Sequence, residues 1–503
     1  MSGSSVRRKI FVLSDWHLGG VPDTDATIGT QICRSANQLA AFINWVGEQA
    51  AAFPGTTEIV INGDMVDFLA PDGDEPAVEW ISDQEKAVRR LNRIVAKARG
   101  PFDGLCKFLE QERTEVTVAL GNHDAELSLP RVRQRLAEIL GNNQRFRMVY
   151  DGEAIVRGRV LIEHGNRYDA WNILNHNGLR EERSHLSRGL PIMEAERSNR
   201  FFRPPAGTLL VVYAFNTLLT EAPFLNLLKP ETQAALPLLI ALEPNMKGVL
   251  DNIIRMAPVI PRRFGTLMQS AAVPADRNNL SGDRLADIDS LEKALQPLLG
   301  ADTGLFVNAR VSPLSMPEGG GMTPLVWVKA RVAQIAKAIR RHLDLSALVR
   351  EAKHEVRGRM LEIAFKRLQH GDSFRPEKEL PEYIEAAGEL LRTGKFDLVV
   401  FGHTHLQKKV TIPRPGQSDG CYINTGTWAD IMKLPPEVMA GGPAARQALG
   451  EFFDRVAARD ISRYLFTSLG YAEIELAGDA IAQHDLRSFT PANPRSAPYT
   501  LFA

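Results

Sequence analysis

The sequence predicts an α/β core that is interrupted by a long, mainly helical insertion. Short apolar runs bounded by Gly, Asp or Asn indicate buried strands, and they occur at residues 10–14, 58–62 and 116–120. Longer segments between these runs carry apolar residues at helical spacing, at 28–52 and 88–108. Strands that alternate with helices favour a sheet covered by helices. From about residue 172 to residue 370, prolines break a mostly helical pattern and strand signals become few.

The strand pattern continues up to the insertion and resumes after it. Closely spaced strands are predicted at 146–150, 154–157 and 159–163. An amphipathic helix at 380–391 is then followed by strand candidates at 396–401, 410–412, 421–424 and 471–474. We therefore divide the chain into a first core part (1–171), a helical insertion or cap domain (172–379), a second core part (380–490) and a Pro-rich tail (491–503).

Composition favours a soluble cytoplasmic protein. The formal net charge of the 503 residues is +0, which disfavours a nucleic-acid partner. Three scattered cysteines without CxxC spacing (Cys33, Cys106 and Cys421) indicate reduced thiols. The first apolar run, at 10–13, is too short for a signal peptide. No uncharged stretch reaches the roughly 18–20 residues that a membrane-spanning helix needs.

Five short clusters of metal-ligand residues are spread along the chain, and four of them close an apolar run. They are Asp15-Trp16-His17, Gly63-Asp64-Met65-Val66-Asp67, Gly121-Asn122-His123-Asp124, His164-Gly165-Asn166 and Gly402-His403-Thr404-His405. Any one cluster alone is usually a turn or a helix cap. Together they supply what two divalent metals about 3.5–4 Å apart require, namely a shared anionic bridge and separate ligands for each ion. Carboxylate, imidazole and amide ligands suit Mn²⁺, Fe or Zn²⁺ better than Ca²⁺, which prefers oxygen ligands alone. Of these ions we expect Mn²⁺, with Fe or Zn²⁺ as alternatives.

These clusters resemble the motifs D-x-H, G-D-x-x-D, G-N-H-[DE], a lone H and G-H-x-H of the calcineurin-like metallophosphoesterase superfamily. The resemblance covers about residues 1–170 and 395–480. It implies a four-layer α/β/β/α sandwich with a dinuclear metal centre at the strand ends. Carried over residue by residue, it implies a first metal held by Asp15, His17, Asp64 and His405. The second metal would be held by Asp64, Asn122, His164 and His403, with Asp64 as the bridging carboxylate.

The same resemblance implies an acid catalyst. His123 matches the family's catalytic histidine, which protonates the leaving oxygen, and Asp67 matches the acid that orients it and raises its pKa. The nucleophile would be a metal-activated water. Two simpler roles compete with these: Asp67 caps the segment that follows it, and Asp124 orients a loop.

A second histidine also fits the lone-His motif. His370-Gly371-Asp372 follows an apparent helix, however, and is typical of a helix end with Gly371 at C′. His164 follows the predicted strand 160–162, which would hold it rigidly, so the sequence favours His164.

Within the superfamily, the motifs look most like the branch that contains UDP-2,3-diacylglucosamine pyrophosphatases. That branch usually has Arg where this chain has His123, and its insertion is shorter. Phe68 and Leu69 follow Asp67, which disfavours a Ser/Thr protein phosphatase. In the insertion, Arg180, Arg183 and Arg188 are candidates for binding substrate phosphate, although interleaved Glu residues equally fit a solvated charged helix. The apolar stretch 209–242 fits either an acyl or membrane-peripheral surface or a helical core.

The sequence therefore predicts a metallophosphoesterase that acts on a phosphodiester or pyrophosphate, small or lipid-linked. The first alternative is a nuclease of the DNA-repair exonuclease type. The zero net charge and the lack of a basic tract with interleaved aromatic residues argue against it. A non-catalytic scaffold is the second, and it predicts eroded ligands, whereas all seven are present.

Overall fold

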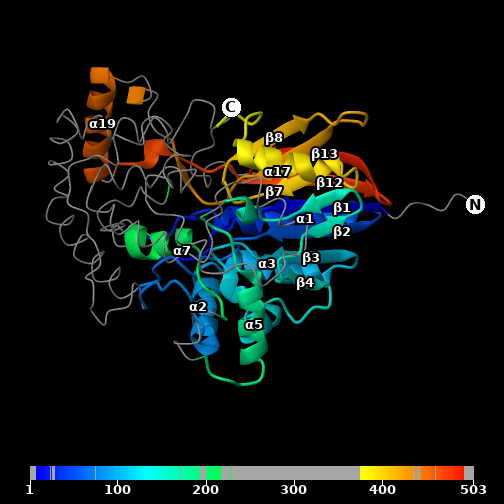
Figure 1. Cartoon of the computed structure of the whole chain (residues 1–503), viewed down its shortest axis with the longest axis horizontal. Helices are drawn as coiled ribbons and strands as arrows, with labels where there is room; N and C mark the ends of the chain where they lie inside the picture. The colour runs from blue at the N-terminus through cyan, green and yellow to red at the C-terminus, as the bar shows by residue number, and fades with distance from the viewer. Residues whose placement is uncertain are drawn as a thin grey trace, which may run out of the picture.

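The structure of the protein, a computed structural model, describes residues 7–22, 24, 29–73, 75–169, 171–192, 200–216, 227, 374–433, 437–438, 442–458 and 460–491. Most of the predicted insertion (172–379) and of the predicted tail (491–503) lies outside the described residues, and so does His370. The described part of the core contains two large sheets with helices on their outer faces (Figure 1).

The larger sheet has the strand order β13-β12-β1-β2-β3-β4. Its parallel strands are β1 (Arg7–Leu13), β2 (Thr56–Asn62), β3 (Thr114–Ala119) and β4 (Phe146–Val149). β12 (Gly470–Ala477) joins β1 in antiparallel register and β13 (Ala480–Ser488) joins β12. Because the carboxyl ends of parallel strands meet at one edge of a sheet, the segments that follow β1, β2 and β3 are brought together there.

The second sheet has the order β5-β6-β7-β9-β8. Its strands are β5 (Ile155–Arg157), β6 (Val160–Ile162), β7 (Leu398–Phe401), β8 (Gln407–Ile412) and β9 (Gly420–Thr425). β6, β7 and β9 are parallel, and β6 and β7 lie side by side although residues 163–397 separate them in the sequence. The segments that follow β6 and β7 therefore also share one edge.

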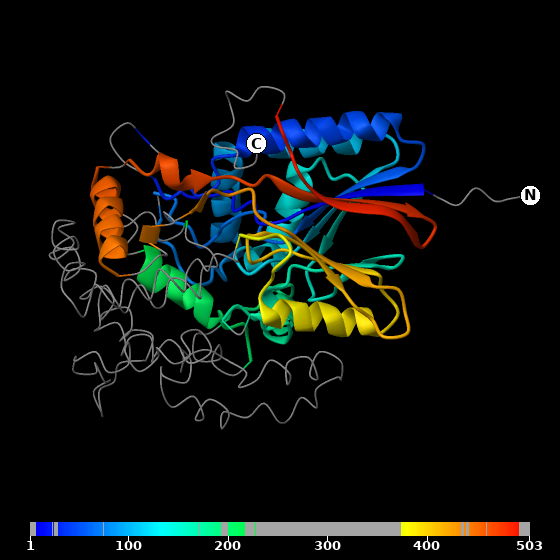
Figure 2. The same ribbon diagram turned by 90° about the horizontal axis from the view of Figure 1, so that it is seen from above.

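The core has four layers. Apolar side chains between the two sheets form one cluster, which includes Ile10, Val12, Val60, Val160, Leu398, Val400, Ile423 and Ile474. The helices on the outer face of the larger sheet include α1 (Ala36–Ala52), α2 (Gln84–Lys97), α3 (Arg99–Glu110) and α4 (Pro130–Ile139). α17 (Pro381–Arg392) covers the second sheet. Figure 2 shows α1 and α17 on opposite sides of the paired sheets, which is the predicted sandwich.

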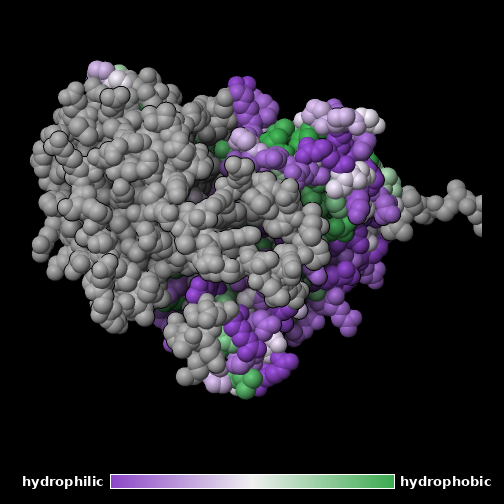
Figure 3. Space-filling model, in the orientation of Figure 1, coloured by the Kyte–Doolittle hydropathy of each residue, from purple (hydrophilic) through white to green (hydrophobic). Residues whose placement is uncertain are grey.

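The remaining described elements lie outside the two large sheets. They are η1 (Ala125–Ser128), η2 (Asn166–Tyr168), α5 (His176–Leu186), α7 (Ala206–Leu210), the π-helical turn η3 (Val211–Phe215), β10 (Ile431–Met432), β11 (Leu465–Phe466), α19 (Gly442–Ala457) and η7 (Ser462–Tyr464). Hydrophilic residues dominate the coloured part of the face seen in Figure 3. Among the described helices, none is long and apolar enough to cross a bilayer.

The predicted α/β fold is confirmed, while two predicted helices need correction. The helix expected at 28–52 begins only at Ala36. The helix expected at 88–108 is in fact two helices, α2 and α3, which divide after Lys97. Pro101 explains the division, because in a continuous helix its ring would clash with the carbonyl of Lys97 and it has no N–H to donate there.

A buried carboxylate ties the two sheets together at the end opposite the carboxyl ends of β1 and β2. Glu58 of β2 is fully buried and accepts hydrogen bonds from Arg157 of β5 (2.9 and 2.7 Å), Arg8 of β1 (2.8 Å) and Thr117 of β3 (2.7 Å). Burial opposes ionisation of Glu58, but the Arg157 guanidinium outweighs it, so that the pKa of this carboxyl lies below its ordinary value. The ionised carboxylate thus crosslinks strands of both sheets.

We predict that Glu58→Gln destabilises the protein by about 3 kcal/mol, because two guanidinium groups lose their shared anion. Since the native pKa is lowered, this contribution is complete above the unfolded-state pKa of about 4.3 and declines as the pH falls through the native pKa. Denaturant unfolding at pH 7 and at pH 4 measures both effects. Glu115→Gln is the matched control, because Glu115 contacts the same Arg8 but is partly exposed. Equal losses in both variants would contradict the crosslink.

Candidate metal centre

All five ligand clusters lie at the carboxyl ends of strands, at one end of the sandwich. Asp15, Asp64 and Asn122 follow β1, β2 and β3, whereas His164 and His403 follow β6 and β7. Backbone hydrogen bonds join the first two loops: Asp15 N donates to Gly63 O (3.1 Å) and His17 N to Asp64 O (2.9 Å). In the second sheet Gly402 N donates to His164 O (2.9 Å). Across the sheets, His403 N donates to Asp15 Oδ2 (3.0 Å), so the ligand loops of the two sheets are in contact.

The first group consists of Asp15, His17, Asp64 and His405, whose ligand atoms all lie within 4.8 Å of one another. The Nε2 atoms of His17 and His405 are 2.9 Å apart. His405 Nε2 is 3.2 Å from Asp15 Oδ1, and His17 Nε2 is 3.6 Å from Asp64 Oδ2. All four residues are buried. These are the four residues that the resemblance implied for the first metal.

The second group consists of Asp64, His164 and His403, again with ligand atoms within 4.8 Å of one another. Asp64 Oδ2 is 3.2 Å from His164 Nε2, so the same oxygen faces His17 and His164. Asp64 Oδ1 accepts instead from the backbone N–H of His123 (2.8 Å). Asn122, the fourth predicted ligand, immediately precedes His123 in this loop and is buried. One carboxylate is therefore common to both groups.

Several of these donor atoms are buried without a hydrogen bond. Among the described residues, the atoms without a hydrogen-bond partner include Asp64 Oδ2, Asn122 Oδ1 and His164 Nε2. Asp64 Oδ2 and His164 Nε2 are 3.2 Å apart. His164 Nδ1 is 2.8 Å from Asn62 O and donates to it, which leaves the lone pair on Nε2. A buried polar atom without a partner costs about 1–3 kcal/mol. Divalent cations would satisfy these atoms, so the donor set fits metal ions.

The charges of the cluster stabilise one another. Burial opposes ionisation of Asp15 and Asp64, but the nearby imidazoles, led by His405 for Asp15 and His164 for Asp64, outweigh it and lower both pKa values. Burial likewise opposes protonation of His17 and His164, but the carboxylates raise their pKa values to about 10 and about 9. Such a high proton affinity shows that the carboxylates create a strongly negative potential, and cations that bind here would displace these protons.

The backbone adopts a strained conformation at the ligands. Five ligand residues have a left-handed φ, namely Asp15 (54°), His17 (47°), Asp64 (51°), His403 (70°) and His405 (65°). A residue other than glycine in this region costs about 1–3 kcal/mol and persists only where the surroundings enforce it. With this backbone conformation, Asp15 and His17 of one loop and His405 of another place their ligand atoms within 4.8 Å of one another.

Two motif glycines are required by close packing around Asp64. A Cβ atom at Gly121 would lie 2.0 Å from Asp64 Oδ1, and one at Gly63 would lie 2.4 Å from His164 Nδ1. Any side chain at these positions would displace the shared carboxylate or the His164 ring. The glycines therefore belong to the geometry of the site.

His123 and Asp67 form a pair beside the first group. His123 Nδ1 is 3.2 Å from Asp67 Oδ1, and Asp67 Oδ2 is 3.6 Å from His17 Nδ1. Burial opposes protonation of His123, but Asp67 outweighs it and raises the pKa of His123, as the sequence predicted. Asp67 Oδ1 also accepts from the N–H groups of Leu69 and Ala70 (2.9 and 3.0 Å). Asp67 therefore caps the following turn and contacts His123 as well.

Two further residues hold the ligand loops in place. Asp124 accepts from Gly121 N (2.7 Å) and Met65 N (2.8 Å), so it has the loop-orienting role that the sequence left open. Sequence reasoning missed Asn424 of β9, which is fully buried and donates to Gly402 O (2.6 Å) and Thr404 Oγ1 (3.0 Å). Its position at the end of a predicted strand was the only signal.

The three arginines predicted to bind substrate belong to α5 and the turn after it. Arg180 and Arg183 both pair with Asp151, and Arg183 also lies 5.1 Å from the centre of the Tyr150 ring. Arg188 donates to Ser184 Oγ (2.6 Å). Their predicted role in substrate binding stays a prediction.

Comparison with known families agrees with the site. Residues 8–215 match the model of a family described as calcineurin-like phosphoesterase. The match contains the loops after β1, β2, β3 and β6, and thus four of the five clusters. No curated protein matches the chain. Residues 8–215 are therefore similar to the calcineurin-like phosphoesterase family, whose members are hydrolases of phosphoric esters.

Proposed function

We propose that the protein hydrolyses a phosphodiester or a pyrophosphate at a centre of two divalent metal ions. The observation that carries the proposal is the carboxylate of Asp64, which one group of nitrogen and oxygen donors shares with another. Asp15, His17 and His405 would complete the first position. Asn122, His164 and His403 would complete the second. A bridging anion with separate ligands on each side is the arrangement that two-metal hydrolases use.

The donor set favours Mn²⁺, with Fe or Zn²⁺ as alternatives. Imidazole, carboxylate and amide donors suit these ions, and no cysteine belongs to either group. The chemistry that such a cation pair supplies is a water molecule activated near neutral pH and compensation of charge on the phosphoryl oxygens.

The residues of the chain itself supply acid catalysis. Asp67 holds the Nδ1 side of the His123 ring, and the backbone N–H of His123 is bound to Asp64. The position of the imidazole is thus fixed relative to the shared carboxylate. His123 would hold a proton on Nε2 and donate it to the leaving oxygen, while Asp67 stabilises the protonated ring.

The nature of the rest of the substrate depends on the insertion. The resemblance to UDP-2,3-diacylglucosamine pyrophosphatases supports a lipid-linked diphosphate and a protein that acts in the cytoplasm or at a membrane surface. The apolar stretch 209–242 that suggested lipid lies mostly outside the described residues. A small-molecule phosphodiester is the other form of the same proposal.

A substrate panel tests the proposal. Mn²⁺-loaded protein should hydrolyse bis(p-nitrophenyl) phosphate, and the panel should extend to phosphomonoesters, nucleotide diphosphates, lipid-linked UDP-sugars and single-stranded DNA. We expect turnover of a diester or pyrophosphate, with loss of activity on chelation of the metal. Preference for DNA would favour the nuclease instead, and no turnover of any ester would favour the non-catalytic scaffold.

We predict that Asp64→Asn weakens the binding of both metal ions, because the amide provides one neutral oxygen in place of the shared charge. Asp15→Asn should weaken mainly the first ion and His164→Gln mainly the second. Metal content after dialysis and calorimetric titration of the metal-free protein measure the stoichiometry of each variant. Retention of two tightly bound ions by Asp64→Asn would contradict the shared-ligand arrangement.

The role of His123 predicts a dependence on the leaving group. His123→Ala should lower kcat about 10²–10⁴-fold for esters with alkyl leaving groups, which need a proton, and far less for p-nitrophenyl esters. Asp67→Asn should show the same trend with a smaller loss. Steady-state kinetics with both ester types provide the test. An equal loss for both types would mean that His123 acts otherwise than as the acid.

A further inference from the structure

The geometry around His403 reveals a residue that neither the motifs nor the resemblance singled out. His403 Nε2 lies 3.1 Å from Asp169 Oδ2. We propose that Asp169 is a positioning residue, which fixes the His403 imidazole in the tautomer that offers Nδ1 to the second metal ion. The inference deepens the proposed function and rests on its second metal position.

The hydrogen bond decides which nitrogen is available. A carboxylate oxygen only accepts, so His403 Nε2 carries the hydrogen and Nδ1 keeps its lone pair. A ligand atom of His403 lies within 4.8 Å of those of Asp64 and His164. Since Nε2 is engaged by Asp169, Nδ1 is the nitrogen left to bind a cation. Metal-binding histidines are commonly oriented by a carboxylate on the opposite nitrogen.

Asp169 is itself held in one orientation. Its Oδ1 accepts from Trp171 N (2.9 Å), and its Oδ2 accepts from Asn172 Nδ2 (2.7 Å) as well as from His403. The side chain is mostly buried, with 19% of its surface exposed. Because both oxygens have donors, the carboxylate cannot rotate without losing a bond.

The segments that carry Asp169 and His403 are also in contact through an aromatic pair. Tyr168, the residue before Asp169, stacks on Phe401 with ring centroids 5.1 Å apart, and its hydroxyl donates to Glu163 Oε1 (2.6 Å). Phe401 ends β7, two residues before His403. The stacked rings therefore join the segment that carries Asp169 to the strand that precedes His403.

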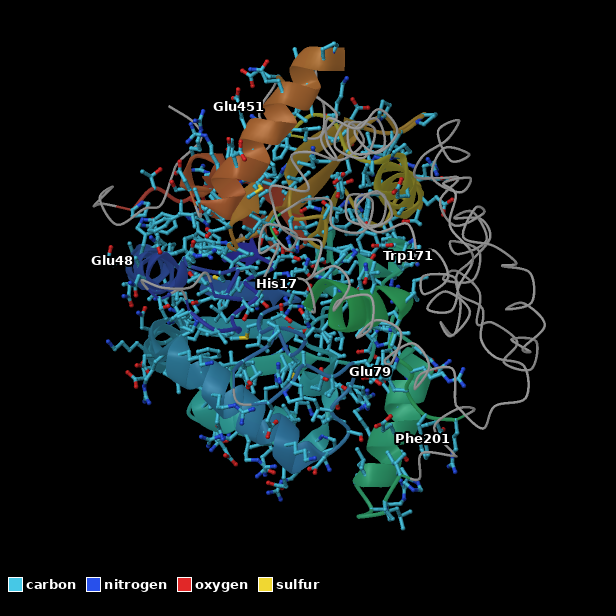
Figure 4. The ribbon with its side chains drawn as sticks, turned by 90° about the vertical axis from the view of Figure 1, so that its left-hand side faces the viewer. His17, Glu48, Glu79, Trp171, Phe201 and Glu451 are labelled. Atoms are coloured by element: carbon cyan, nitrogen blue, oxygen red, sulfur yellow. The ribbon has the colours of Figure 1, made fainter. Side chains whose placement is uncertain are left out.

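Asp169 also connects the site to the start of the insertion. Trp171 O accepts from Gly207 N of α7 (2.7 Å), and Figure 4 shows His17 near the centre of the molecule, with α7 and Trp171 to one side of it. η3 continues α7, and Asn216, which follows η3, donates to Leu69 O (2.7 Å), next to the turn that Asp67 caps. The start of the insertion is thus bonded to the segments that hold His403 and Asp67.

Calorimetric titration of the metal-free full-length protein with Mn²⁺ tests the proposal. In Asp169→Asn, the NH₂ group of the amide must face at least one of the N–H groups that donate to the carboxylate in the wild type. Because an NH₂ group cannot accept a hydrogen bond, that bond is lost. We expect the second ion to bind about 10–100-fold more weakly, with the first ion unchanged. Raising the Mn²⁺ concentration should restore kcat. Asp485→Asn, a carboxylate change on the exposed β13, is the control and should alter neither ion.

The outcomes separate this inference from the function on which it rests. Two ions that bind as tightly to Asp169→Asn as to the wild type would overturn the positioning role and leave the metal centre intact. Equal weakening of both ions, or a lower thermal midpoint of the metal-free variant, would mean a general structural role and also overturn it. Fewer than two ions on the wild type would instead contradict the proposed function. If Asp169→Asn does not fold, Asn172→Ala takes its place, with selective weakening of the second ion expected.

Discussion

The carboxylate of Asp64 is the interaction on which the rest of the site depends. Its Oδ2 faces His17 and His164, which come from different sheets, and its Oδ1 binds the backbone of the loop that carries Asn122 and His123. The absence of a side chain at Gly121 leaves the space that this carboxylate occupies, and the absence of one at Gly63 leaves space for the His164 ring. Four strands of two sheets (β1, β2, β3 and β6) therefore have to be correctly placed before one carboxylate can serve two metal positions.

At the opposite end of the sandwich, the buried carboxylate of Glu58 is paired with the polar groups around it. There Glu58 has a hydrogen-bond donor for each oxygen and joins both sheets. At the ligand end, by contrast, Asp64 Oδ2, Asn122 Oδ1 and His164 Nε2 are buried without a hydrogen-bond partner among the described residues. The five left-handed ligand residues add backbone strain at the same place. Without cations, the unpartnered polar atoms and the strained backbone of the site lower the stability of the folded protein. The rest of the structure has to offset this loss. The apolar core between the sheets and the Glu58 crosslink do so.

Part of this arrangement could be predicted from the sequence. Apolar runs that end in Asp, Asn or His predict ligands at strand ends, and Asp15, Asp64 and Asn122 do follow the carboxyl ends of β1, β2 and β3. Their role as metal ligands stays a prediction. Strand β13 was missed because it is a largely exposed edge strand without an apolar run. The left-handed φ of His17 and the hydrogen bonds of Asp169 and Asn424 depend on partners distant in sequence, which no local pattern encodes. Likewise, the spacing of Arg180 and Arg183 gave no sign that both would meet Asp151.

The shared role of Asp64 can be measured directly by anomalous diffraction from crystals grown with Mn²⁺. The account predicts two anomalous peaks about 3.5–4 Å apart, with Asp64 between them. One peak should lie against Asp15, His17 and His405, and the other against Asn122, His164 and Nδ1 of His403. A single peak, or two peaks of which only one contacts Asp64, would contradict the account.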